Sequence, residues 1–211
     1  MLRHVTERFF HSGTLNIYSL NTMQAEQVKF STIEEAVEAF KKGQFVIVMD
    51  DEDRENEGDL ILAAELVTAE KVALALRHTS GILCAPMTYS RANELRLPIM
   101  VTENTDPNKT AFTISCDANE TSTGVSAQDR YLTFAALADS SRGSSDFRRP
   151  GHVFPLIAKP DGVLQRRGHT EAAVDLCKLA DLTPVGFIGE MMKQDGKIRS
   201  RNFQDQIRKF N

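Results

Sequence analysis

The chain has 211 residues, of which 41% are hydrophobic and 26% are charged. This length and composition are typical of one soluble globular domain, and they exclude disordered, collagen-like and coiled-coil proteins. Because the formal net charge is −4, we expect no general attraction to nucleic acids or to anionic membranes, so an anionic ligand needs a local site.

The cysteines and the N-terminal segment bear on the cellular compartment. The three cysteines lack the paired spacing of a zinc ribbon or a disulfide framework, which favours a reducing compartment. The N-terminal segment lacks the apolar core of a secretory signal, and no apolar run is long enough to span a membrane. We therefore expect a cytoplasmic protein. Mitochondrial import is the weaker alternative, because residues 1–22 are rich in basic and hydroxyl side chains and contain one acid.

The first ordered elements are predicted to follow an N-terminal extension. Residues 1–27 are expected to be disordered, and residues 28–211 to form a single domain. Ser31 and Glu34 have the spacing of a capping box, and the apolar residues after them recur at helical spacing as far as Gly43. The pattern predicts an amphipathic helix at the start of the domain.

The rest of the chain alternates between apolar runs and segments with helical spacing. Short apolar runs predict strands at residues 45–49, 60–64, 82–85, 111–116, 153–158 and 185–191. Helical spacing predicts helices at residues 69–78, 90–95, 127–138 and 170–180. A long connection is expected over residues 140–152. Because the elements alternate irregularly, we expect a three-layer α/β (α+β) sandwich, with a mixed sheet and helices on both sides, rather than an all-parallel doubly wound sheet.

An acidic segment, residues 50–59, joins the first two predicted strands. Seven of its ten residues are carboxylic acids, and Arg54 is its only base. A solvated loop is the ordinary interpretation of such a run. The apolar strands on both sides anchor this segment, however, and oxygen-rich loops at strand ends hold hard cations such as Mg²⁺. Gly58 lets the chain turn tightly enough to direct neighbouring carboxylates inward.

A second candidate site lies at the start of the helix predicted from residue 170. Gly168, His169 and Thr170 occupy its N-terminus, and Arg166 and Arg167 precede them. Backbone N–H groups, the positive end of the helix dipole, a hydroxyl and two guanidinium groups together favour phosphate binding. An ordinary capped helix with surface arginines is the structural alternative, in which His169 is a cap rather than a metal ligand.

Two further residues have the chemistry of acid–base catalysts. His152 stands just before a predicted strand, next to two arginines, where an imidazole can donate or accept a proton. Glu190 lies inside the apolar run VGFIGEMM, and burying a carboxylate is costly unless the group is paired or functional. A structural role is the alternative for His152, whereas Glu190 is a stronger candidate than the surface acids.

These segments, read in chain order, resemble one enzyme family. Similarity to 3,4-dihydroxy-2-butanone 4-phosphate synthase is carried by the motifs DDEDRENEGDLILAAE, RHTSGILCAPM, STGVSAQDR, RRPGHVFPL, RRGHTEAAVDLCKLA and VGFIGEMM. The resemblance covers residues 30–197. It implies conversion of ribulose 5-phosphate into the butanone phosphate and formate in riboflavin biosynthesis. It also implies a homodimer with active sites near the subunit interface, and the family's own α/β sandwich fold.

The resemblance also implies roles for particular residues. Glu55 and His169 would ligate Mg²⁺, which Mn²⁺ could replace because a histidine ligand is soft for Mg²⁺. His152 and Glu190 would be the essential catalytic pair. The substrate-binding residues that the resemblance implies are Arg54, Glu55, Asp59, Arg166, Arg167, Gly168, His169 and Thr170. Asp59 is our candidate for removing the C3 proton of the sugar, which a divalent ion would make more acidic.

Two alternatives from other functional classes remain open. One is another divalent-metal-dependent sugar-phosphate isomerase or aldolase, which would release no formate. The other is an inactive homologue that acts as a binding protein, because the sequence departs from the family pattern after Ile198. We also expect a monofunctional protein, since no second domain carries the zinc-binding cysteines of GTP cyclohydrolase II.

Overall fold

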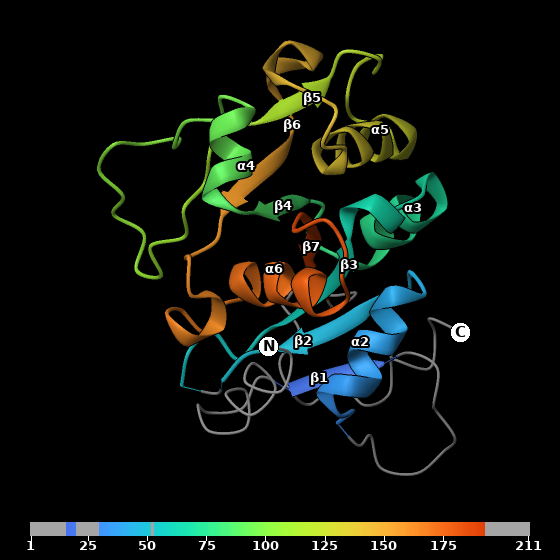
Figure 1. Ribbon diagram of the computed structural model, residues 1–211, viewed down its shortest axis with the longest axis vertical. Coiled ribbons are helices and arrows are strands. Elements are labelled where there is room, and N and C mark those ends of the chain that lie inside the picture. The colour runs from blue at the N-terminus through green and yellow to red at the C-terminus, as the bar shows by residue number, and fades with distance from the viewer. Residues whose placement is uncertain (1–15, 20–29, 52, 193–211) are drawn as a thin grey trace.

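The computed structural model of the protein describes residues 16–19, 30–51 and 53–192, which form a sheet with helices on both faces (Figure 1). The strands are β1 (Asn16–Ser19), β2 (Val46–Met49), β3 (Gly58–Ala63), β4 (Cys84–Met87), β5 (Cys116–Ala118), β6 (Phe147–Ile157) and β7 (Gly186–Glu190). The helices are α2 (Ile33–Lys41), α3 (Ala69–His78), α4 (Tyr89–Glu94), α5 (Ala127–Ala138) and α6 (His169–Leu179). Short 3₁₀ helices are η1 (Ala64–Leu66), η2 (Ser144–Asp146) and η3 (Gly162–Leu164).

The described strands form one seven-stranded sheet with the order β1-β2-β3-β7-β4-β6-β5. β4 and β6 are parallel, whereas the other neighbouring strands pair in antiparallel fashion. Strands that are distant in sequence, such as β3 and β7, are therefore neighbours in the middle of the sheet. The mixed sheet that the irregular alternation predicts is confirmed.

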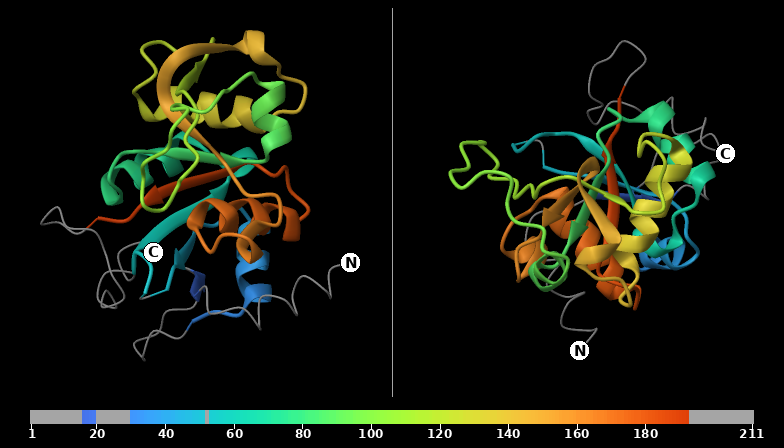
Figure 2. Two further views of the ribbon diagram at one scale, coloured as in Figure 1. Left: turned by 90° about the vertical axis from the view of Figure 1, so that its left-hand side faces the viewer. Right: turned by 90° about the horizontal axis from the view of Figure 1, so that it is seen from above.

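Side chains of the central strands alternate between two separate cores. Val46 and Val48 of β2 pack in the core that contains Phe40 of α2 and residues of α6. Ile47 and Met49 pack in the other core, which contains residues of α3 and α5. Both faces of β2 are buried, as expected for a strand between two helical layers. Figure 2 shows α6 (orange) and α5 (yellow) on opposite sides of β7 (red), so the predicted three-layer sandwich is confirmed.

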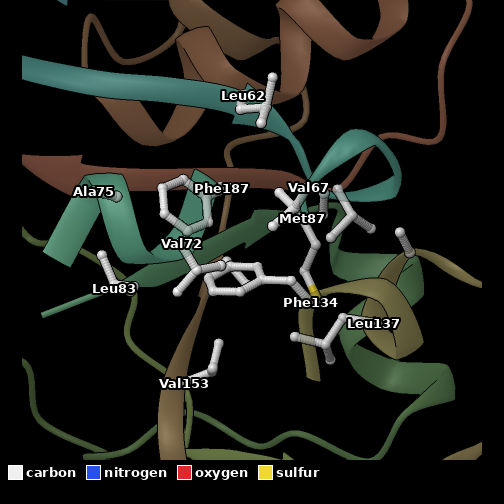
Figure 3. Packing of buried hydrophobic residues seen from close by; sticks show 14 of the residues in the cluster. Leu62, Val67, Val72, Ala75, Leu83, Met87, Phe134, Leu137, Val153 and Phe187 are labelled. Carbon is white, nitrogen blue, oxygen red and sulfur yellow. The ribbon is translucent and has the colours of Figure 1, made fainter. Parts of the chain in front are cut away.

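The core between the sheet and helices α3 and α5 is built around two aromatic rings. Phe134 of α5 and Phe187 of β7 are fully buried, and their ring centroids lie 4.7 Å apart. Leu62, Val72 and Leu137 pack in the same cluster (Figure 3). Burial of such a side chain contributes about 1.5–3 kcal/mol. This core fixes the positions of β3 and β7, and it thereby positions the polar residues at the ends of these two strands.

Most helix boundaries agree with the sequence prediction. Thr68 caps α3 by accepting a hydrogen bond from the N–H of Lys71, and Ser126 caps α5. The capping box of α2 is formed by Thr32 and Glu35, one residue later than the predicted pair. Both pairs are three residues apart, so the spacing alone does not distinguish them. The residue at which the folded helix begins determines which pair forms the capping box. None of the described helices is long and apolar enough to cross a membrane.

The prediction of a connection over residues 140–152 is wrong in its second half, because β6 begins at Phe147. β6 pairs with β5 in an irregular register: Val153 lies opposite Cys116, whereas Arg148 lies opposite the next residue of β5. The four residues between Arg148 and Val153 therefore form a bulge. This bulge is polar and contains a proline and a glycine, so no alternating apolar pattern marks it as part of a strand.

The strand predicted at residues 111–116 is also wrong for most of its length. The backbone N–H of Thr113 donates to Pro155, whereas the N–H of Ile114 donates to Pro98. Because successive residues bond to different segments, they form isolated bridges instead of a continuous ladder. The regular strand β5 starts only at the end of the predicted run.

The prediction of a disordered extension over residues 1–27 is wrong for residues 16–19, which form β1. β1 pairs with β2 in antiparallel fashion, and Asn16 lies opposite Met49. This pairing gives hydrogen-bond partners to the backbone of β2, which would otherwise be an open edge of the sheet. The other residues of the expected extension lie outside the described residues.

Candidate functional site

Three segments that are far apart in the sequence meet at one end of the central strands. The acidic segment leads from β2 into β3, β7 ends at Glu190, and α6 begins at His169. Asp59 of β3 lies directly opposite Glu190 in the register of the sheet. Between these segments lies a cavity of about 140 Å³. Its lining residues are Arg54, Glu55, Asp59, Ile82, Cys84, Thr110, Phe112, Leu156, Arg166, His169, Thr170, Ile188, Gly189 and Glu190.

Asp50 organises the acidic segment. Its buried carboxylate accepts hydrogen bonds from the backbone N–H groups of Glu55 (3.1 Å) and Glu57 (2.9 Å). The guanidinium of Arg54 donates to the same carboxylate at 2.6 Å. These bonds occupy both carboxylate oxygens, so the segment is an organised turn and not a freely solvated loop. The turn directs Glu55 toward α6.

Glu55 and His169 lie close enough to share a cation. The Nδ1 atom of His169 is 3.9 Å from Oε2 of Glu55 and 3.6 Å from Oδ1 of Asp59. Ligand atoms of Asp50, Glu55 and His169 all lie within 4.8 Å of one another. Oδ1 of Asp59 and Nε2 of His169 are buried and have no hydrogen-bond partner. Buried polar atoms are normally bonded, so these groups fit a divalent ion held by carboxylate oxygens and an imidazole nitrogen. Asp50 accepts three hydrogen bonds, whereas Glu55 accepts one on each oxygen, from Arg54 and from Asn108, so Glu55 has fewer bonds to give up to an ion.

The carboxylic acids around the cavity have raised pKa values, because they are desolvated and lie close to one another. Desolvation, followed by the charges of Glu190 and other nearby acids, raises the pKa of Glu57 to about 7. Desolvation also raises the pKa of Asp59 to about 6, although His169 opposes the shift. The pKa of Glu190 is raised by desolvation and then by the charge of Glu55. A cation in the cavity would relieve this repulsion.

The N-terminus of α6 brings Gly168, His169 and Thr170 to the cavity rim. Gly168 precedes the helix, and a Cβ atom at this position would lie 2.2 Å from Nη1 of Arg166. A larger residue would therefore displace the arginine. The first N–H groups of a helix have no partner within it, so this terminus offers donors to an anion, as the sequence predicts.

The two arginines before α6 have different surroundings. Arg166 lines the cavity, and its guanidinium bonds to Glu171 (2.7 Å), to the hydroxyl of Thr110 (2.9 Å) and to the carbonyl of Asn108 (3.2 Å). Arg167 is half-exposed, and its Nη1 atom lies 3.7 Å from Oδ2 of Asp51. Arg166 therefore stabilises the segments that line the site in addition to contributing positive charge. Arg167 makes fewer contacts with protein groups and is the more available cation for an anionic ligand.

The sequence did not reveal the segment that covers Glu55. The side-chain amide of Asn108 donates to Oε1 of Glu55 at 2.5 Å, and Thr110 and Phe112 line the cavity. Asn108 lies in a region predicted only as a loop, 53 positions from Glu55. No local pattern marks such a contact. Cys84 also lines the cavity, and desolvation raises the pKa of its thiol, which favours the protonated and less reactive form.

The two predicted catalytic residues are placed differently. Glu190 is exposed at the end of β7 and lines the cavity, so its carboxylate is not buried within the apolar run. The four residues before it in β7 are buried, and the strand ends where the carboxylate reaches the cavity. His152 lies in the β6 bulge and does not line the cavity. Its Nδ1 atom is instead 2.8 Å from Oδ2 of Asp117, a residue that the sequence analysis did not single out.

The structure thus divides the ten predicted site residues. Those that line the cavity are Arg54, Glu55, Asp59, Arg166, His169, Thr170 and Glu190. Gly168 and Arg167 adjoin it through the start of α6, and His152 lies apart.

Comparison with known proteins identifies the family of this chain. A sequence model described as 3,4-dihydroxy-2-butanone 4-phosphate synthase matches residues 34–211, which extends beyond residue 197, the expected limit of the resemblance. The synthase of Candida albicans is 53% identical over 173 residues, covering 82% of this chain and 85% of that protein. A solved synthase in complex with two magnesium ions has a TM-score of 0.78 and 48% identity, covering 86% of this chain and 88% of that one.

Relatives differ in length. The synthase of Helicobacter pylori strain J99 is 54% identical over 169 residues, which are 80% of this chain but 49% of that protein. The chain therefore spans about half the length of this relative and most of the length of the Candida albicans protein.

Proposed function

Because this chain belongs to the 3,4-dihydroxy-2-butanone 4-phosphate synthase family, we propose that it catalyses the reaction for which the family is named. In this reaction D-ribulose 5-phosphate gives L-3,4-dihydroxy-2-butanone 4-phosphate and formate, a step of riboflavin biosynthesis. The observation that carries the proposal is the cavity in which Glu55, Asp59, His169 and Glu190 meet from three distant segments. It combines acids, a candidate cation site and a helix N-terminus within one small volume.

We propose that Glu55 and His169 hold Mg²⁺, for which Mn²⁺ can substitute. When bound, the ion supplies electrophilic stabilisation of negative charge that develops on the substrate oxygens. The proposal is supported by the unpartnered Nε2 of His169 and Oδ1 of Asp59. The solved relative with two magnesium ions shows that a protein of this fold binds the metal.

Asp59 is the proposed base for the C3 proton. Its buried carboxylate has a pKa raised to about 6, and a general base works best when its pKa lies near the operating pH. Glu190 lies opposite Asp59 in the sheet register, and its pKa is also raised, so it is placed to return or remove a second proton. Two carboxylates in adjacent strands thus provide the relay that loss of a hydroxyl and of formate requires.

Substrate phosphate is proposed to bind at the start of α6. The backbone N–H groups near Gly168 to Thr170 provide donors, and Arg167 is an available cation. Arg166 and Arg54 line the cavity, where each is bonded to acidic side chains. Through these ion pairs the two arginines stabilise the segments that line the site, in addition to contributing positive charge.

We propose further that the protein is a homodimer in which His152 acts at the cavity of the partner subunit. His152 is exposed and does not line the cavity of its own chain, so an essential role in the reaction needs a second chain. Active sites near the subunit interface, which the family resemblance implies, meet this need.

The activity is tested by incubating the pure protein with ribulose 5-phosphate and Mg²⁺ and measuring formate and the butanone phosphate. We expect both products in equal amounts, and neither with the Glu55→Gln variant. Conversion to another pentose phosphate without formate would indicate an isomerase, and cleavage to shorter sugars an aldolase. Absence of any turnover would support a binding protein.

The role of His152 across the interface is tested by mixing inactive variants. A dimer of one His152→Ala subunit and one Glu55→Gln subunit has one intact site if His152 acts in trans. After subunit exchange at equal concentrations, about half of the dimers are mixed, so about one quarter of the wild-type activity should return. If His152 acts within its own chain, no activity returns.

A further inference from the structure

We propose that Asp117 is the positioning residue for His152, holding the imidazole with its proton on Nδ1 so that Nε2 is free for proton transfer. This inference rests on the proposed catalytic role of His152. It assigns a function to a carboxylate that lies outside the cavity and outside every motif that the sequence analysis connected with chemistry.

Asp117 contacts His152 at two points. One carboxylate oxygen, Oδ1, accepts the backbone N–H of His152 at 2.8 Å, and the other, Oδ2, lies 2.8 Å from the ring Nδ1. An ionised carboxylate only accepts hydrogen bonds, so the ring nitrogen that faces it must carry the proton. The neutral imidazole then has its lone pair on Nε2. Asp117 is 4% exposed, whereas the His152 side chain is 44% exposed, so a buried group orients a ring that reaches solvent.

The backbone around the pair is shaped to bring the two residues together. His152 lies in the bulge of β6 where the register with β5 shifts between Cys116 and Asp117. Within this bulge, the N–H of Gly151 donates to the hydroxyl of Ser115 at 3.1 Å. Bulges in strands redirect side chains, and this one turns His152 toward Asp117.

A glycine closes one side of the pair. Gly124 has a φ of +85°, and a Cβ atom there would lie 2.0 Å from Oδ2 of Asp117 and 2.5 Å from Nδ1 of His152. Its N–H is held by the buried carboxylate of Asp129 at 3.2 Å. The hydrogen bond between the imidazole and the carboxylate is therefore covered by backbone in contact with it. Close packing of this kind restricts the ring to one orientation.

Replacement of Asp117 by asparagine should invert the tautomer. The backbone N–H of His152 can only donate, so the single oxygen of the introduced amide would accept it, and the amide nitrogen would face the ring. That nitrogen donates to Nδ1, which must then give up its proton to Nε2. The ring keeps its place but presents a proton where the reaction needs a lone pair. We expect Asp117→Asn to lower kcat about 10²- to 10⁴-fold with little change in KM.

The test combines kinetics with nitrogen-15 NMR of the full chain at about pH 8.5, where a free imidazole is neutral. We expect the proton on Nδ1 in the wild type and on Nε2 in Asp117→Asn. A wild-type ring protonated on Nε2 would overturn the proposal without any variant. An inverted tautomer with unchanged kcat would overturn it as well.

Two control variants separate this inference from its premise. Ser115→Ala removes the neighbouring hydrogen bond to Gly151 without touching the ring, and it should keep the wild-type tautomer and kcat. A fall in kcat equal to that of Asp117→Asn would show that loosening of the bulge is the cause. His152→Gln should lose at least as much activity as Asp117→Asn. If His152→Gln remains active, the catalytic role of His152 fails, and the role of Asp117 fails with it. If His152→Gln is inactive and Asp117→Asn is not, only the role of Asp117 fails.

Discussion

Two buried aspartates of this protein, Asp59 and Asp129, are 3% and 4% exposed but have opposite surroundings. Asp129 accepts hydrogen bonds from the N–H and hydroxyl of Ser122 and from the N–H of Gly124, and these bonds lower its pKa. Asp59 has an oxygen without a partner, and desolvation raises its pKa to about 6.

The difference shows that burial alone does not assign a role to a carboxylate. Asp129 is stabilised in its charged form by the N–H groups and the hydroxyl of the turn before α5. Asp59 is held in the cavity by the sheet, while the cavity itself disfavours its charge. Of these two buried acids, Asp129 with its full set of partners stabilises the fold, whereas Asp59 with an unpartnered oxygen is available to a ligand or a proton.

The largest effect is expected from removing the proposed metal ligands. Glu55→Gln and His169→Ala should each lower metal-dependent turnover by about 10³-fold or more, since an electrophilic ion stabilises the transition state by several kcal/mol. Excess EDTA should abolish wild-type activity, and Mg²⁺ or Mn²⁺ should restore it. Isothermal titration with Mg²⁺ alone checks binding directly. Near wild-type kcat in either variant would contradict that ligand assignment.

The comparison itself is tested by the same substitution at both aspartates. Asp59→Asn should lower kcat about 10²- to 10⁴-fold and leave the melting temperature unchanged or raised, because it removes a charge that the cavity disfavours. Asp129→Asn should lower the melting temperature, because an amide group would face the backbone donors of Ser122 or Gly124. Thermal melts and steady-state kinetics of both variants decide the point. A larger loss of stability for Asp59→Asn would break the comparison.

Arg166 extends the comparison to a cation, because it lines the cavity and each of its three guanidinium nitrogens also donates to a protein group. Arg166→Ala should raise KM for ribulose 5-phosphate about 10- to 100-fold, from loss of about 1.5–3 kcal/mol of charge-assisted binding. It should also destabilise the fold by up to about 3–5 kcal/mol, because the buried Glu171 loses its cation.

The double variant Arg166→Ala/Glu171→Gln separates these two effects. It should recover stability while KM stays high. Arg167→Ala is the matched control, since Arg167 is half-exposed and its removal should leave the melting temperature unchanged. Recovery of KM together with stability would reduce Arg166 to a structural role.

The smallest effect is a pH dependence of stability in metal-free protein. The pKa values of Glu57 and Asp59 are raised to about 7 and about 6, so the folded state binds more protons than the unfolded state between about pH 4 and pH 7. Stability must then fall as the pH rises through this window, by about 1.4 kcal/mol for each pKa unit at the buried Asp59 and by less at the half-buried Glu57, whose charge is screened by solvent.

We expect the wild-type melting temperature to fall by a few degrees from pH 5 to pH 7.5 relative to a Glu57→Gln/Asp59→Asn variant. Addition of Mg²⁺ at pH 7.5 should reverse the wild-type decrease. Parallel melting curves for the two proteins would show that these acids are not coupled to folding.

Local patterns in the sequence determined most of the secondary structure. Helices such as α3 and α5 were predicted from apolar spacing, which depends on neighbours within one or two turns. The β6 bulge and the bridges near Thr113 were missed, because their backbone partners come from other segments. The strand β1 was missed for the same reason: its pairing depends on the open edge of β2.

The sequence by itself also identified seven of the residues that line the cavity. The acidic segment, the start of α6 and Glu190 were identified as candidates because each concentrates charge or donors in a short stretch. Only the tertiary structure decided how they act together. The register of β3 and β7 places Asp59 opposite Glu190, and the helix N-terminus brings His169 to within 3.6 Å of Asp59. The contacts of Asn108 with Glu55 and of Asp117 with His152 join positions 53 and 35 residues apart. Such contacts depend on how the sheet is ordered, and no periodicity within a single segment encodes that order.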